Sequence, residues 1–232
     1  MPGTDSLYSS LLAIVLLLSL LSLPAKAVEA ASEEPAATIL IIAYGPFAGR
    51  GVNGSQTLAE ALHGQQIAGY EIVSSVLPVR WGAPEAALPD LLAQHRPALI
   101  LGLGEGHPDH IAIEMRAHNR AEHPDEAGQP APAQLASEGP EQRSARFFVD
   151  IQALPETPIP IRHSEDAGSY LCNSLLYHSL ASSVAKVGFV HLPPQGAVAA
   201  EPYRSALQPL ILAMLEQNLG AAARPSQVQQ DP

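Results

Sequence analysis

The chain alternates short, continuous apolar runs with stretches in which apolar residues recur every three or four positions. The runs have the length and residue types of strands, and they occupy residues 37–43, 70–77, 98–103 and 186–192. Residues 84–94 and 203–219 have the periodicity of amphipathic helices. Strands that alternate with helices at this spacing predict a parallel sheet with right-handed crossovers, and therefore an α/β domain.

Weaker patterns fill the gaps between these elements. Residues 111–116 and 157–163 alternate apolar with other residues, which predicts two more strands. Ser55 is of a residue type that caps helices, so a helix is expected to begin there. Residues 120–142 are polar and rich in Pro, Ala and Glu, and a stretch of this length predicts either a surface excursion or a functional lid.

The first segment of the chain differs from the rest. Residues 11–23 form an apolar run that is too short to span a bilayer comfortably, because about 20 apolar residues are needed. The run has the length of a signal-peptide core, and Ala25-Lys26-Ala27 has the small-x-small form of a cleavage site. The residues before it carry Asp5 and no Lys or Arg, so an uncleaved anchor and a misassigned start stay open.

These observations divide the chain into four parts. Residues 1–27 are predicted to be a signal peptide or N-terminal anchor, and residues 28–36 a linker. Residues 37–220 are predicted to form the α/β domain, and residues 221–232 a disordered tail. The protein is therefore expected to be exported, either periplasmic or secreted, with or without a membrane anchor.

Composition narrows the function classes. The chain has 232 residues, of which 47% are hydrophobic, and this suits one domain with a full core. It has 12 basic and 23 acidic residues and a net charge of −11, which argues against nucleic acid as a partner. The single cysteine, Cys172, excludes an internal disulfide, so in an exported protein its thiol is either buried or kept for reactivity.

Cys172 lies where a thiol would be activated. It falls in the first turn of a predicted helix that follows a strand, where the helix dipole and unpaired N–H groups favour a thiolate and can hold an oxyanion. His191 ends one strand and Glu114 lies on another. A thiol, an imidazole base and an orienting carboxylate together predict thiol acyl transfer. The alternative is a buried cysteine that acts as a small apolar residue.

Two aromatic residues follow the first strand. Tyr44 and Phe47 lie in the loop beyond residues 37–43, and ligands of open α/β sheets bind beyond the carboxyl ends of the strands. They are therefore placed either to line a pocket or simply to pack the loop.

Histidines near Glu114 suggest a second chemistry. His110, Glu114 and His118 would share one face of a helix and could hold zinc, with His107 and His123 nearby. The residues between them favour a strand, however, which spreads these side chains beyond tetrahedral reach. We therefore predict no metal ligands, and a zinc-binding periplasmic protein is kept as an alternative.

Several separated motifs resemble those of the pyroglutamyl peptidase I family, also called pyrrolidone-carboxylate peptidases. The cysteine segment, S-x-x-A-G-x-Y-x-C-N at residues 164–173, is the most specific. G-F-V-H-L-P at residues 188–193 is similar to the family's histidine segment, and I-A-I-E at residues 111–114 resembles its glutamate segment. Weaker matches occur at residues 46–55, 77–79 and 124–130. The resemblance spans about residues 39 to 215.

The resemblance implies a cysteine exopeptidase that removes an N-terminal pyroglutamyl residue from peptides. Cys172 would be the nucleophile, His191 the base and Glu114 the residue that orients the imidazole. The residues that would bind the substrate are Tyr44, Phe47, Asn53 and Leu103. The implied fold is a three-layer α/β/α sandwich around a mostly parallel, mixed and twisted sheet, phosphorylase/hydrolase-like. The resemblance implies no metal or organic cofactor, and a homo-oligomer, commonly a homotetramer.

The chain departs from the family pattern at four positions. Gly45 replaces a glutamate, Leu103 an amide, and His107 and Glu122 each replace an arginine. These changes concern substrate preference and oligomeric state more than activity. A non-catalytic relative that binds N-terminally blocked peptides, and another cysteine acyl transferase acting on small amides, therefore stay open as alternatives.

Overall fold

The computed structural model describes residues 37–196 and 198–219. The predicted signal peptide or anchor at residues 1–27, the linker at 28–36 and the tail at 221–232 lie outside these described residues. Within them, none of the helices combines the length and the apolar character that crossing a bilayer requires.

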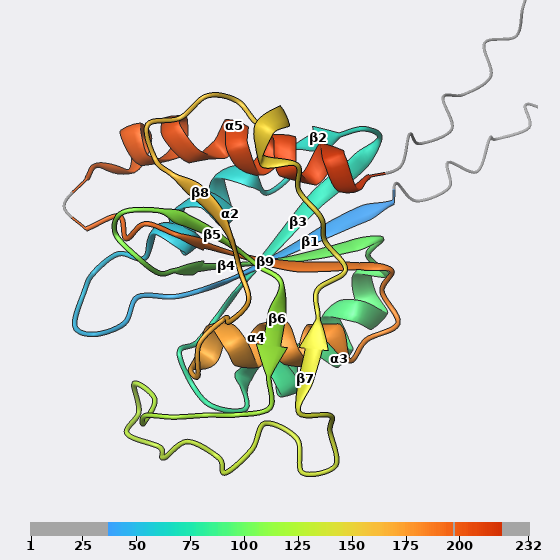
Figure 1. Ribbon diagram of the computed structural model, residues 1–232, viewed down its shortest axis with the longest axis vertical. Helices are drawn as coiled ribbons and strands as arrows, with labels where there is room; N and C mark the ends of the chain where they lie inside the picture. The colour runs from blue at the N-terminus through green and yellow to red at the C-terminus, as the bar shows by residue number, and fades with distance from the viewer. Residues whose placement is uncertain (1–36, 197, 220–232) are drawn as a thin grey trace, which may run out of the picture. The chain divides into compact units, whose positions relative to one another are not determined.

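A seven-stranded sheet forms the centre of the domain (Figure 1). Its strands, in spatial order, are β2 Gln66–Ile67, β3 Tyr70–Leu77, β1 Thr38–Tyr44, β4 Leu99–Glu105, β9 Lys186–Leu192, β5 Ile111–Glu114 and β8 Ile161–Ser164. The central strands β3, β1, β4 and β9 run parallel to one another. β2 runs antiparallel to β3, and β5 runs antiparallel to β9. The sheet is therefore mixed and mostly parallel, as expected.

Helices cover both faces of this sheet and make three layers (Figure 1). α2 Gly54–Leu62 and α5 Ala200–Asn218 pack on one face, and α3 Ala83–His95 and α4 Leu171–Leu180 pack on the other. Strand β1 is continuously apolar because both of its faces are buried. Ile39 and Ile41 belong to the core under α2 and α5, whereas Leu40 and Ile42 belong to the core under α3 and α4.

Two predicted strands are shorter than expected. The strand predicted at residues 111–116 ends at Glu114, and the chain then forms β6 Arg116–His118, which pairs with β7 Gln142–Ser144 in a separate two-stranded sheet. The strand predicted at residues 157–163 begins only at Ile161. Pro158 and Pro160 precede it, and proline lacks the N–H donor that a sheet ladder needs.

The polar stretch between β6 and β7 is a surface excursion held by its own side chains. The Asp125 carboxylate accepts hydrogen bonds from the backbone N–H groups of Trp81, Ala127 and Gln129. The Asn119 amide bridges both backbone groups of Ala136. The residues from 123 to 142, all within the described part of the chain, do not line the cavity at the sheet edge. In the described residues this stretch therefore has the arrangement of a surface excursion, one of the two predicted alternatives.

Candidate active site

A cavity of about 390 Å³ opens at the carboxyl edge of the parallel strands. Its wall combines the ends of β1, β4 and β9 with the first turn of α4. The three predicted catalytic residues, Cys172, His191 and Glu114, all line it. The structure therefore brings together three side chains that lie far apart in the sequence.

Cys172 is the second residue of α4 and is partly exposed to the cavity. Gly104 of β4 lies directly behind its sulfur. A Cβ atom at Gly104 would come within 2.6 Å of Cys172 Sγ and 2.8 Å of the Phe189 ring. Only glycine therefore leaves room for the thiol at this place. We did not single out Gly104 from the sequence, although the alternation of Gly102, Gly104 and Gly106 at a strand end was a signal for a close approach.

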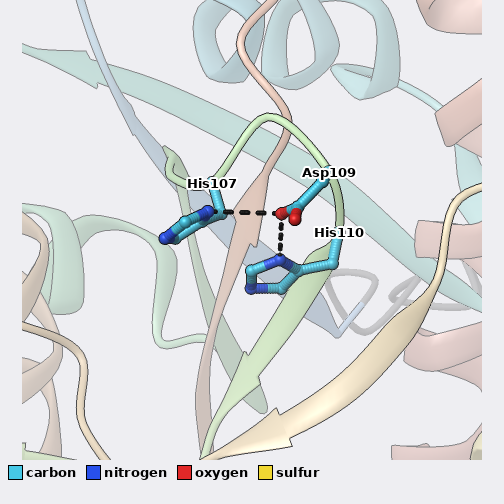
Figure 2. Close-up of side chains that lie close together, drawn as sticks. All are labelled: His107, Asp109 and His110. Atoms are coloured by element: carbon cyan, nitrogen blue, oxygen red, sulfur yellow. Dashed lines mark hydrogen bonds and ion pairs between the residues drawn. The ribbon is translucent and has the colours of Figure 1, made fainter.

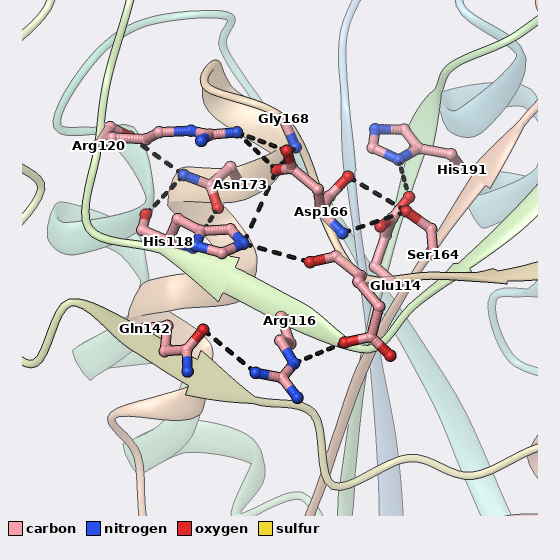
Figure 3. Close-up of polar contacts among 11 residues, drawn as sticks. Glu114, Arg116, His118, Arg120, Gln142, Ser164, Asp166, Gly168, Asn173 and His191 are labelled. Carbon is pink, nitrogen blue, oxygen red and sulfur yellow. Dashed lines mark hydrogen bonds and ion pairs between the residues drawn. The ribbon is translucent and has the colours of Figure 1, made fainter.

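Glu114 and His191 form a buried hydrogen-bonded pair. Glu114 Oε1 lies 2.7 Å from His191 Nδ1, and the two side chains are 2% and 15% exposed (Figure 3). Ala112 pairs with His191 in the antiparallel ladder of β5 and β9. Glu114 lies two residues further along β5, hence on the same face of the sheet as Ala112. Glu114 Oε2 has no hydrogen-bond partner among the described residues.

His191 also interacts with Cys172, and the two partners together set its charge. Burial of the imidazole opposes protonation, but the negative charge of Cys172 and hydrogen bonds to Cys172 and Glu114 raise the pKa of His191 to about 10. Since Nδ1 faces Glu114, the Nε2 atom is the one left for the thiol. The arrangement places a protonated imidazole beside the Cys172 sulfur, where thiol acyl transfer needs its proton donor.

Tyr44, which ends β1 where a loop residue was expected, and Phe47, in the loop after it, both line the cavity and both also make packing contacts. The Tyr44 hydroxyl donates a hydrogen bond of 2.8 Å to the carbonyl oxygen of Leu171, at the first turn of α4. The Arg50 guanidinium lies 4.1 Å from the centre of the Phe47 ring. The two interpretations of these aromatic residues, pocket lining and loop packing, are therefore compatible.

The other two predicted substrate contacts differ from expectation. Leu103 is fully buried in the core under α2 and α5, on the sheet face away from Cys172, so assigning its side chain to substrate binding was wrong. Asn53 does line the cavity, but its amide donates to the Gly45 carbonyl and accepts from both the backbone and the hydroxyl of Ser55. Asn53, and not Ser55, is therefore the N-cap of α2.

Glu105 is a buried carboxylate that we did not single out from the sequence. Its side chain is 1% exposed and accepts hydrogen bonds from the backbone N–H of Gly54 at 2.6 Å and of Gln195 at 3.0 Å. It also pairs with Arg50 at 2.5 Å. Glu105 is the last residue of β4 and lines the cavity. Its contacts with Arg50, Gly54 and Gln195 connect the loops that follow β1 and β9.

The turn before Cys172 is fixed to the neighbouring chain segment by polar contacts (Figure 3). Asp166 accepts two hydrogen bonds from Arg120, and Glu165 pairs with Arg116. Asn173, fully buried next to Cys172, accepts from His118 N–H and donates to the carbonyl oxygens of His118 and Arg120. These contacts determine where the first turn of α4 lies, and therefore where the sulfur lies.

Glu122, which replaces a family arginine, lies outside the cavity lining. Its carboxylate accepts a hydrogen bond from the Ser169 hydroxyl, and its backbone N–H donates to the Ser169 carbonyl. The acidic group therefore supports the turn before α4.

The metal set considered from the sequence does not form. Glu114 faces His191, whereas His118 contacts the Glu165 carbonyl and lies near Asp166, so neither joins His110. Within the described residues, His110 instead lies beside His107 and Asp109 in the loop between β4 and β5. Asp109 was missed because the histidines were paired with Glu114 alone.

An α/β sheet that carries a cysteine, a histidine and a glutamate at one cavity has the arrangement of a thiol-dependent hydrolase. Comparison with known proteins identifies the family to which this chain belongs. The pyroglutamyl peptidase family model matches residues 37–223. A pyrrolidone-carboxylate peptidase of Chromobacterium violaceum is 34% identical over 170 residues, which are 69% of this chain and 80% of that protein. The chain belongs to the pyroglutamyl peptidase family.

Solved structures share the fold. A mutant pyrrolidone carboxyl peptidase from Pyrococcus furiosus superposes with a TM-score of 0.68 at 24% identity, over 78% of this chain and 100% of that one. Pyroglutamyl peptidase I of Bacillus amyloliquefaciens gives a TM-score of 0.66 at 24% identity, over 77% of this chain and 97% of that one. The expected α/β fold, a mostly parallel sheet between helices, is confirmed.

The Glu114–His191 pair predicts a pH-dependent contribution to stability. Because the pKa of His191 is raised from 6.5 to about 10, the protonated ring stabilises the folded state fully below pH 6.5, and this contribution is lost as the pH rises through about 10. Glu114→Gln keeps a hydrogen-bonding group but loses the charge. We expect it to lower the free energy of unfolding by about 1–3 kcal/mol at neutral pH, and by much less above about pH 10.

Urea unfolding of wild type and variant across this pH range measures the difference. Glu138→Gln, which removes an exposed carboxylate, is the matched control and is expected to have little effect. A Glu114→Gln deficit that stays constant up to the highest pH would contradict the assignment of charge to His191.

Proposed function

We propose that this protein is a cysteine exopeptidase that removes an N-terminal pyroglutamyl residue from peptides. The observation that carries the proposal is the hydrogen bond between Glu114 and His191, together with Cys172, at the wall of a cavity large enough for the end of a peptide. Family membership gives the substrate class, because the related proteins are named as pyroglutamyl or pyrrolidone-carboxylate peptidases.

The reaction follows from the geometry. The Cys172 thiolate attacks the carbonyl carbon of the peptide bond that joins the pyroglutamyl residue to the rest of the peptide. The backbone N–H groups of the first turn of α4 stabilise the resulting oxyanion. The His191 imidazolium gives its proton to the leaving amine, so that the amide bond breaks and the shortened peptide departs. The neutral imidazole then takes a proton from water, which attacks the thioester, and pyroglutamate leaves as the thiolate reforms. Glu114 holds the ring in orientation throughout.

The aromatic wall of the cavity suits the cyclised end-group. A pyroglutamyl ring is flat and uncharged, and it can pack against the faces of aromatic rings. Tyr44 and Phe47 place two such rings at the cavity, and Tyr44 is anchored by its hydroxyl to the helix that carries Cys172. The intact site favours the peptidase over a non-catalytic relative that only binds blocked peptides, because decay of the activity would leave no reason to keep a charged, buried Glu–His pair.

Turnover of a pyroglutamyl naphthylamide tests the proposal. We expect the wild type to release the naphthylamine, and Cys172→Ser to lower kcat/KM by at least about 10³-fold, because the hydroxyl is a far weaker nucleophile. Since Cys172 is the only cysteine, one equivalent of iodoacetamide is expected to abolish activity, and bound product to slow the labelling. A folded wild type without turnover would leave the binding-only alternative in place.

Phe47 provides a test of how the substrate is held. Phe47→Ala is expected to raise KM by roughly tenfold with a smaller change in kcat, because its ring contacts substrate in the ground state and transition state alike. Phe148→Ala is the matched control, since that ring is 66% exposed and lies outside the cavity lining. Equal effects of the two substitutions would count against a substrate contact at Phe47.

We further propose that the protein is exported. The support is the apolar run at residues 11–23 followed by Ala25-Lys26-Ala27. Expression of the full chain in a bacterium, followed by fractionation and N-terminal sequencing, is expected to give either a mature protein that begins at Val28 or an intact protein in the membrane fraction. An uncleaved chain that stays in the cytosolic fraction would contradict export.

A further inference from the structure

A cluster of two histidines and one aspartate lies at the rim of the cavity (Figure 2). His107, Asp109 and His110 all come from the short loop between β4 and β5. The Asp109 Oδ1 atom lies 3.2 Å from His107 Nδ1 and 2.6 Å from His110 Nδ1. Figure 2 shows both imidazoles turned toward the same carboxylate oxygen. The three potential ligand atoms lie within 4.8 Å of one another.

The two distances to Asp109 Oδ1 are close to those that a tetrahedral metal ion requires between its ligand atoms. Zinc binds imidazole nitrogen and carboxylate oxygen at about 2.0–2.2 Å, so two of its ligand atoms lie about 3.3 Å apart. The distance from His107 to Asp109 already has this value, and the contact from His110 to Asp109 needs to open by less than about 1 Å. Two imidazoles with one carboxylate favour zinc, copper or nickel over magnesium or calcium.

The three side chains are partly fixed in place. The His110 side chain is only 8% exposed, and its ring stacks on that of His107 with centroids 4.8 Å apart. His107 and Asp109 are 68% and 75% exposed, which leaves an entry path for an ion and room for water as a further ligand.

We propose that His107, Asp109 and His110 form a binding site for one divalent transition-metal ion, with zinc as the probe. The site is separate from the thiol chemistry, because none of its three members belongs to the Cys172–His191–Glu114 set. It is nevertheless close to that set. His107 and His110 line the same cavity, and a Cβ atom at Gly106 would come within 2.8 Å of His191 Cβ, so the loop begins directly against the imidazole.

A metal ion at this rim narrows access for the peptide that leaves or enters. We therefore infer that zinc lowers kcat/KM for peptide substrates through this site, and this second part rests on the proposed function. The proposal that zinc binds does not rest on the proposed function, because the binding is measured on protein in which the nucleophile, Cys172, is replaced.

Calorimetric titration of zinc chloride into Cys172→Ala protein without a polyhistidine tag tests the binding. The substitution removes the thiol, which is itself a zinc ligand. We expect one equivalent to bind, and His107→Ala or Asp109→Asn to weaken the binding by at least about tenfold. Both changes are at exposed side chains and are expected to leave the fold intact. His123→Ala, an exposed histidine outside the cluster, is the control and should leave the affinity unchanged.

Saturable binding that persists at full strength in both His107→Ala and Asp109→Asn would overturn the site, and so would an absence of binding. The second part is tested with the thiol in place. Zinc is expected to inhibit the wild type at lower concentration than it inhibits Asp109→Asn, and equal inhibition of the two would assign the effect to Cys172 instead. If the protein has no peptidase activity, the titration still decides whether the metal site exists.

Discussion

The hydrogen bond between Glu114 and His191 is the contact on which the site depends. It exists because Ala112 of β5 pairs with His191 in the antiparallel ladder, so Glu114, two residues further along β5, lies on the same face of the sheet and diagonally opposite the imidazole. A buried carboxylate with one oxygen unpartnered is costly unless it stabilises a charge nearby. The raised pKa of His191 shows where that cost is offset, since the imidazolium is held by Glu114 on one side and by Cys172 on the other.

The rest of the site fixes the position of the sulfur relative to this pair. Gly104 removes the side chain that would occupy the place of Sγ, and Asn173 secures the first turn of α4 against the segment after β6. Glu105 joins the loops after β1 and β9 at the same cavity. Each of these residues is buried or sterically confined, so their arrangement is set by packing in the fold and is present before any substrate arrives.

Much of the fold was predictable because its strands are buried on both faces and therefore continuously apolar, as in residues 37–43 and 98–103. The short edge strand β8 was overestimated because an alternating pattern does not register the missing N–H groups of Pro158 and Pro160. Cys172, His191 and Glu114 were predictable from motifs. The roles of Gly104, Glu105 and Asn173 were not predictable, although Asn173 belongs to the cysteine motif, because they depend on contacts with segments remote in sequence. Leu103 failed as a substrate contact because strand alternation turns its side chain to the opposite face.

The most direct test of the account is the detection of an acyl group on the sulfur. An activated pyroglutamyl ester, mixed with the wild type and quenched in acid within the first turnover, is expected to leave one pyroglutamyl group on the peptide that contains Cys172, as measured by mass spectrometry. With Glu114→Gln the same adduct is expected to form more slowly. Ester hydrolysis that proceeds while Cys172 stays unmodified at every quench time would contradict the central claim.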